Sequence, residues 1–64
     1  MKEEIYELIN TKEYYSIQEI MEGLKIPKEK IPEVKRILED GVDLKEIERA
    51  LKYKKPWYRR KPVE

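Results

Sequence analysis

Apolar side chains recur at intervals of three and four along the first half of the chain, which is the spacing of one face of an α-helix. The first such series is Met1, Ile5, Leu8 and Ile9. Acidic residues fill the first turn of this segment, where the positive end of the helix dipole favours them. We expect a helix over residues 2–10.

A second series begins after a connection over residues 11–15. Its members are Ile17, Ile20, Met21 and Leu24, an i, i+3, i+4, i+7 pattern. Ser16 and Glu19 have the spacing of a capping box, in which the hydroxyl and the carboxylate each accept a free backbone amide hydrogen. The sequence therefore predicts a second helix that begins directly after Ser16.

Prolines indicate where a third helix starts. Pro32 suits a first helical turn, because an amide hydrogen at that position would have no acceptor within the helix. A short turn over residues 27–31 would lead into this helix, and Gly41 would end it in a left-handed conformation. Its buried face would consist of Ile31, Val34, Ile37 and Leu38.

The next segment repeats the helical pattern. Asp43 and Glu46 predict a second capping box. The helix should end near Lys54, since Pro56 disfavours a helical conformation in the residue before it. Its buried face would consist of Leu44, Ile47 and Leu51. Because no alternation of apolar and polar residues indicates a strand, we expect an all-α fold, a small bundle of three to four short helices.

The chain has 64 residues and contains neither Cys nor His, which limits its chemistry. Its core must hold by packing alone, without disulfides or the usual zinc ligands. With one Ser, one Thr and no imidazole, a nucleophile activated by His cannot be built. We expect a protein that is not an enzyme and that needs no metal or cofactor. No run of about 20 apolar residues could span a bilayer, so we expect a cytoplasmic protein without a membrane partner; its wealth of Lys, Glu and Ile resembles that of hyperthermophile proteins.

Charge divides the chain into two parts. Residues 1–48 carry eight basic and thirteen acidic side chains, a net charge of −5, whereas residues 49–64 carry seven basic and one acidic, a net charge of +6. Two Tyr and the only Trp are interleaved with these basic residues. Cations beside aromatic rings suit a polyanion whose bases can stack. We expect a single helical domain over residues 1–54 and a basic arm over residues 55–64, with nucleic acid as the partner.

Most of the side chains expected to contact nucleic acid belong to this basic segment. Tyr53 and Tyr58 should be half exposed, with their hydroxyls near phosphates or solvent. Trp57 could either stack on a base or pack over the fourth helix. The contact residues expected in this segment are Lys52, Lys54, Lys55, Trp57, Tyr58, Arg59, Arg60 and Lys61.

Two segments share a cap, an aliphatic residue, Glu-Ile, a small residue and Leu-Lys: SIQEIMEGLKIPK from Ser16 and DLKEIERALKYKK from Asp43. Either two capped helices of similar composition match by chance, or each segment resembles the first helix and turn of a helix-turn-helix DNA-binding unit. The first copy continues as GLKIPKEKIPEVKRIL, with Lys25 where the family's turn has Gly. The resemblance implies a helix-turn-helix-like bundle whose groove-facing end carries Lys28, Glu29, Lys30, Glu33 and Lys35. Two acids in this set favour backbone contact over base reading.

The second copy, EDGVDLKEIERALKYKKPWYRR, resembles the helix-turn-helix of resolvase-like recombinases. This resemblance implies a recognition helix with Lys54 near its cap and Pro56 in its first turn, cut short by Pro62, or else an extended arm along a phosphate backbone or in a minor groove. The order of the first three helices also matches a winged-helix domain, although no paired strands of a wing are evident after Gly41. These resemblances favour DNA over RNA and a role in transcription regulation.

A protein partner is the alternative. The segment GVDLKEIERAL resembles the third-helix region of ubiquitin-associated three-helix bundles, which implies a protein-binding module. A homodimer is a further alternative, since a chain this small gains stability by burying an apolar face against a copy of itself. Salt-dependent binding to duplex DNA would distinguish the nucleic-acid function from both.

Overall fold

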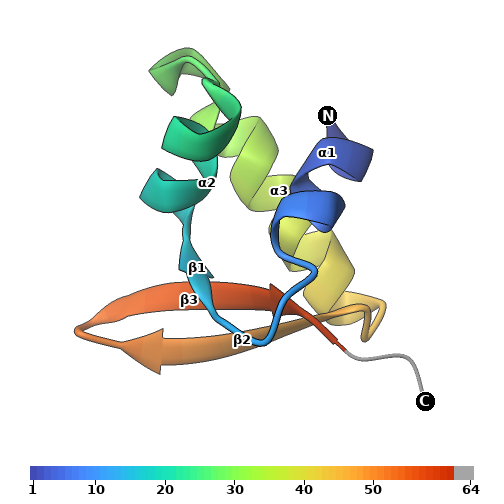
Figure 1. The fold of residues 1–64 in the computed structure, drawn as a ribbon. Coiled ribbons are helices and arrows are strands. Elements are labelled where there is room, and N and C mark those ends of the chain that lie inside the picture. The colour runs from blue at the N-terminus through green and yellow to red at the C-terminus, as the bar shows by residue number, and fades with distance from the viewer. Residues whose placement is uncertain (62–64) are drawn as a thin grey trace.

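The computed structural model describes residues 1–61 and contains both helices and strands (Figure 1). In chain order the elements are α1 (Lys2–Leu8), β1 (Tyr15–Ser16), α2 (Ile17–Leu24), the 3-10 turn η1 (Lys28–Lys30), α3 (Ile31–Asp43), β2 (Ile47–Lys52) and β3 (Lys55–Arg60). The strands form one antiparallel sheet in the order β1-β3-β2. The prediction of an all-α fold is therefore wrong, because the protein is mixed α/β.

The three α-helices form where the apolar spacing predicts them. The capping box at the start of α2 is present: the Ser16 hydroxyl accepts the Glu19 amide at 3.2 Å, and a Glu19 carboxylate oxygen accepts the Ser16 amide at 3.0 Å. Pro32 lies in the first turn of α3, directly after the short turn η1. Local rules of capping and proline geometry are sufficient to locate these helices.

Two lysines in the left-handed conformation follow α2 and α3. Lys25 has a φ of 55° and Lys45 a φ of 63°. The amide after Lys25 donates to the Met21 carbonyl at 2.9 Å, and the amide after Lys45 donates to the Gly41 carbonyl at 2.8 Å. Glycine is usual at such positions, because a Cβ atom crowds a left-handed backbone. Both helix ends are therefore strained.

Gly41 does not end α3, contrary to the prediction, because the helix continues to Asp43. A Cβ atom on Gly41 would lie 2.5 Å from Cδ1 of Ile47 and 2.8 Å from the hydroxyl of Tyr6. Here α3 approaches β2 and α1 so closely that only glycine fits.

The predicted fourth helix does not form, and its residues build a hairpin instead. β2 pairs with β3 along six residues, from Ile47 opposite Arg60 to Lys52 opposite Lys55. The two copies of the internal repeat therefore have different structures, a helix in α2 and a strand in β2. Cross-strand partners and burial therefore override the helical pattern of the local sequence in the second copy.

Pro56 is tolerated in β3 although β3 is the central strand. β1 reaches only Tyr58 and Trp57, so one side of Pro56 has no neighbouring strand whose hydrogen bond would be lost. The segment expected as a basic arm is thus part of the sheet as far as Arg60. Lys61 follows the strand, and the last three residues of that expected arm, 62–64, including the predicted stop at Pro62, lie outside the described residues.

The core lies between the sheet and the three helices, which all cover the same face of the sheet (Figure 1). Most of the buried residues are those of the predicted helical faces, but Tyr6 and Tyr58 join them. Leu44 and Leu51, expected to be buried on the fourth helix, are 64% and 78% exposed. Within residues 1–61, no helix is both long and apolar enough to cross a membrane.

Candidate nucleic-acid interface

The hairpin of β2 and β3 carries the basic segment on two faces. Because side chains alternate along a strand, β3 directs Tyr58 into the core and Trp57 and Arg59 to the opposite face, here called the outer face. No helix of the described chain covers the outer face (Figure 1). Its cross-strand pairs are Glu48 with Arg59, Ala50 with Trp57 and Lys52 with Lys55.

An open hollow lies on the outer face near the tip of the hairpin. It is lined by Lys12, Glu13, Tyr14, Lys52, Tyr53 and Trp57. Three aromatic rings thus meet from the connection before β1, from the hairpin turn and from β3. Trp57 is half-buried, and its indole N–H donates to the Lys52 carbonyl at 3.0 Å. Trp57 therefore lies at the surface in a fixed orientation, not in the core.

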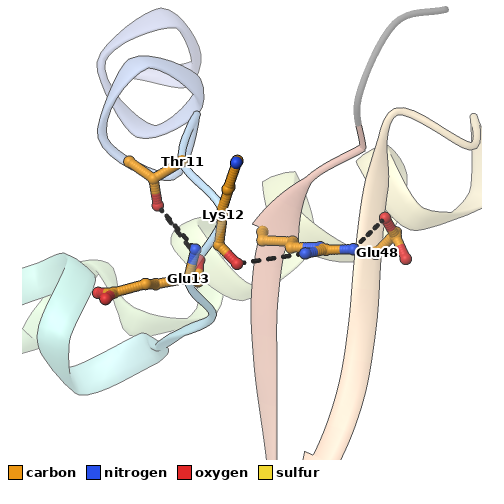
Figure 2. Close-up of polar contacts among 5 residues, drawn as sticks. Thr11, Lys12, Glu13 and Glu48 are labelled. Carbon is orange, nitrogen blue, oxygen red and sulfur yellow. Dashed lines mark hydrogen bonds and ion pairs between the residues drawn. The ribbon is translucent and has the colours of Figure 1, made fainter.

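Arg59 is held within the outer face. Its guanidinium donates to the Glu48 carboxylate at 3.1 Å and to the Lys12 carbonyl at 3.2 Å, the two contacts that end at these labelled residues in Figure 2. It also lies over the ring of Tyr14, 4.9 Å from the ring centre, and Lys52 Nζ lies 5.3 Å from the same centre. Arg59 therefore positions Tyr14, and Glu48 offsets part of its charge.

Three lysines at the tip form no ion pair with residues 1–61. Lys52, Lys54 and Lys55 are exposed, and no carboxylate of residues 1–61 lies within ion-pair distance of them. The turn between the strands consists of Tyr53 and Lys54, with φ values of 52° and 62°. Such a turn normally takes Asn-Gly, because both residues need a positive φ. The tip is therefore a strained, exposed and strongly basic feature.

Tyr58 is buried in the core and not half exposed as predicted. Its hydroxyl donates to one oxygen of Glu39 on α3 at 2.6 Å, and Arg49 of β2 pairs with the other oxygen. Burial, together with the bond to Glu39, raises the pKa of Tyr58 above its ordinary value. The hydrogen bond from Tyr58, with help from Arg49, holds the pKa of Glu39 below its usual range. Tyr58 is thus a buried donor that joins β3 to α3.

Arg60 and Lys61 lie at the end of the hairpin far from the tip. The Arg60 guanidinium lies over the ring of Tyr6, 4.8 Å from its centre. The Tyr6 hydroxyl donates to Glu46 at 2.9 Å, and burial with this bond raises the pKa of Tyr6 to about 12. The Lys61 amide donates to the Glu46 carbonyl at 2.8 Å. A separate hollow at this end contains Arg60 and Tyr6 and is also lined by acidic residues of α1, so this end is less positive than the tip.

The remaining predicted contact residues lie apart from the outer face. Lys28 and Lys30 belong to η1, at the end of the molecule away from the sheet (Figure 1). Lys30 pairs with Glu33 at 3.6 Å. Lys35 is exposed on α3 in a groove that α3 forms with the hairpin, where Glu39 is its neighbour. The structure therefore separates the predicted contacts into a hairpin group and a helix group.

The sequence did not indicate Lys12 and Tyr14 as parts of this site, because both belong to the predicted connection over residues 11–15. Only the antiparallel pairing of β1 with β3 brings them to the hairpin. The one feature of the sequence that could have indicated a contact site here is Lys12 two positions before Tyr14, and this pattern is common. Within residues 1–61, no group of three carboxylates is placed to hold a metal ion.

Comparison of the chain with protein-family models, with curated proteins and with solved structures gave no match.

Proposed function

We propose that this protein is a non-enzymatic module that binds nucleic acid through the tip and outer face of its hairpin, with DNA as the preferred partner. The observation that carries the proposal is the group of three exposed lysines without acidic partners, Lys52, Lys54 and Lys55, around the rings of Tyr53 and Trp57. Clustered cations without acidic partners attract a phosphate backbone by releasing its counterions. The aromatic rings add a surface that suits bases.

The order of the elements supports DNA as the partner. A chain that runs α1-β1-α2-α3-β2-β3, with sheet order β1-β3-β2, resembles a winged-helix DNA-binding domain in which the hairpin is the wing. The paired strands after α3 are the feature that the sequence alone did not indicate. In this chain the wing, and not α3, is the basic element, since α3 carries Glu33, Glu39, Asp40 and Asp43 against two basic residues. We therefore expect contact with the phosphate backbone more than base reading.

A duplex titration at several salt concentrations tests the proposal. If the three tip lysines neutralise phosphates, a plot of log affinity against log salt concentration should have a slope of roughly −3 or steeper. Changing all three lysines to Ala should make this slope less steep by about 3. The matched control changes Lys28, Lys30 and Lys35 to Ala, which removes equal charge from the helix group. A slope near zero, or no binding to either a duplex or a single strand at low salt, contradicts the proposal, and a larger effect of the control variant moves the interface to α3.

Self-association is the second candidate, and the free edge of β2 favours it. In the sheet order β1-β3-β2, one side of β2 has no strand beside it within the described chain, and Leu51 on this strand is 78% exposed. An unpaired edge with an exposed apolar residue can pair with the same edge of a second copy. Sedimentation equilibrium at high protein concentration tests this, with Leu51→Lys as the variant expected to be monomeric. A monomer at every concentration excludes the dimer.

A further inference from the structure

We propose that the hollow on the outer face is a stacking site for an unpaired base, so that the protein prefers a single strand, or the single-stranded end of a duplex, to a blunt duplex. This inference rests on the proposed binding of nucleic acid and specifies which form is bound. Trp57 and Tyr53 would contact the base, and Lys52 and Lys55 the neighbouring phosphates.

The indole of Trp57 is fixed before any ligand arrives. Its cross-strand partner is Ala50, a small residue that leaves room for the indole to lie across β2. The indole N–H reaches the carbonyl of Lys52, two residues further along β2, so the ring leans toward the hairpin tip. A side chain held in this way loses little conformational entropy when a base stacks on it.

Tyr53 extends the aromatic surface beyond Trp57. Its ring lies 6.4 Å from the Trp57 ring, centre to centre, at an interplanar angle of 66°. It is 87% exposed and occupies a position with positive φ, which a Tyr adopts only at an energetic cost. Neither its burial nor its backbone conformation explains a Tyr there. Strained residues concentrate at functional sites, and stacking gives this one a role.

Basic side chains lie beside the aromatic rings of the hollow, where they could contact the phosphates of a nucleotide whose base stacks on Trp57. Lys52 and Arg59 both lie over Tyr14, so this ring, which lines the hollow, contacts two cations. Lys55 Nζ lies over the Trp57 ring, 4.9 Å from its centre, but its side chain is exposed and flexible. A base can displace this ammonium group from the ring, and the ammonium can then meet the phosphate of that nucleotide. In a blunt duplex both faces of every internal base are already stacked, and only the two end pairs expose a face, so few bases are available to the hollow.

Trp57 is the only Trp in the chain, so its fluorescence reports directly on the site. The probes are a strand of about ten thymidines, an abasic strand of the same length and a blunt duplex, all titrated at one salt concentration. We expect the thymidine strand to quench Trp57 and to bind roughly tenfold tighter than the abasic strand, which has the same phosphates and no bases.

Tyr53→Asn is the decisive variant, because Asn suits the turn better than Tyr and the fold is retained. It should bind the thymidine strand more weakly than wild type does, but still more tightly than wild type binds the abasic strand because Trp57 remains, and its salt slope should be unchanged, since all cations remain. Tyr53→Phe keeps the ring and should bind like wild type.

Equal affinity for the thymidine and abasic strands, or tighter binding to the blunt duplex, overturns the stacking site and leaves the proposed function intact. No binding to any of the three at low salt overturns both.

Discussion

The hydroxyl of Tyr58 donates to the carboxylate of Glu39 at 2.6 Å, a hydrogen bond that joins the central strand to α3. Tyr58 is fully buried, and Arg49 of β2 holds the other oxygen of Glu39. All three residues come from elements that enclose the core, so the sheet and the helix layer are connected by one charged network as well as by apolar packing. The inner face of the hairpin, where this network lies, therefore has a structural role, whereas the outer face does not take part in it.

Removing the Tyr58 hydroxyl should destabilise the fold without altering the outer face. Tyr58→Phe keeps the ring and loses a hydrogen bond to a charged group, and we expect a loss of about 1 to 2 kcal/mol in the free energy of unfolding, because Glu39 can be partly rehydrated. Urea unfolding measures it. Tyr53→Phe is the control, since its hydroxyl is exposed and should contribute nothing. Equal stability of the two variants would contradict a structural role for the Tyr58 hydroxyl.

The lowered pKa of Glu39 predicts a sensitivity to acid. Because the folded pKa lies below the ordinary value of 4.5, the charged carboxylate stabilises the fold above that pH, and this contribution should disappear as the pH falls through the lowered pKa. Glu39→Gln should therefore be less stable than wild type at neutral pH, with the difference shrinking in acid. The effect is modest, since the Glu39 side chain is 37% exposed and solvent screens it. A difference that is constant with pH would contradict the assignment.

At alkaline pH, ionisation of Tyr6 should lower the free energy of unfolding. Its pKa rises from 10.0 to about 12 in the folded protein, so the neutral hydroxyl stabilises the fold fully below pH 10, and this contribution is lost as the pH rises from 10 to 12. Tyr6→Phe should abolish this part of the alkaline loss. Ultraviolet absorbance of tyrosinate, followed together with circular dichroism, measures both events. Ionisation of Tyr6 near its ordinary value of 10.0, with the fold intact, would contradict the prediction.

Gly41→Ala should destabilise the protein although Ala is the better helix former. The gain of about 1 kcal/mol in helix propensity is outweighed by overpacking, which costs typically 1 to 3 kcal/mol, because the new Cβ atom would meet buried Ile47 and a Tyr6 hydroxyl that Glu46 holds. Gly23→Ala is the matched control. Its Cβ atom would lie 3.4 Å from the nearest atom, in ordinary contact, so this variant should be stabilised. Thermal unfolding of the pair checks the opposite signs.

Lys25→Gly should stabilise the protein by about 0.5 to 1 kcal/mol. The left-handed conformation at φ 55° strains a Lys but not a Gly, and this relief exceeds the entropy that Gly adds to the unfolded chain. Lys35→Gly, in the exposed middle of α3, should instead lose about 0.7 kcal/mol. If both substitutions destabilise equally, Lys25 is not strained.

Much of the helical layer could be predicted from the sequence. Ser16 and Glu19 locate the start of α2, Pro32 locates the first turn of α3, and the apolar spacing identifies most of the core. These features depend on interactions within a few residues, which the local sequence contains. The clustering of cations and aromatic rings after residue 48 is also evident from the sequence, as is the charge difference between the two parts of the chain.

Only the tertiary structure decided whether residues 47–60 form a helix or a hairpin, and with it which side chains face outward. Leu51 and Ile47 fit a helical face, yet in the hairpin Ile47 is buried and Leu51 exposed. The sequence predicted a half-exposed Tyr58, whereas the structure buries it with Glu39 of α3 as its acceptor, and Tyr14 joined the site only through the pairing of β1 with β3. The reason is physical. A strand obtains its hydrogen bonds and its burial from distant segments, so a pattern that is locally compatible with a helix becomes a strand where those partners are present.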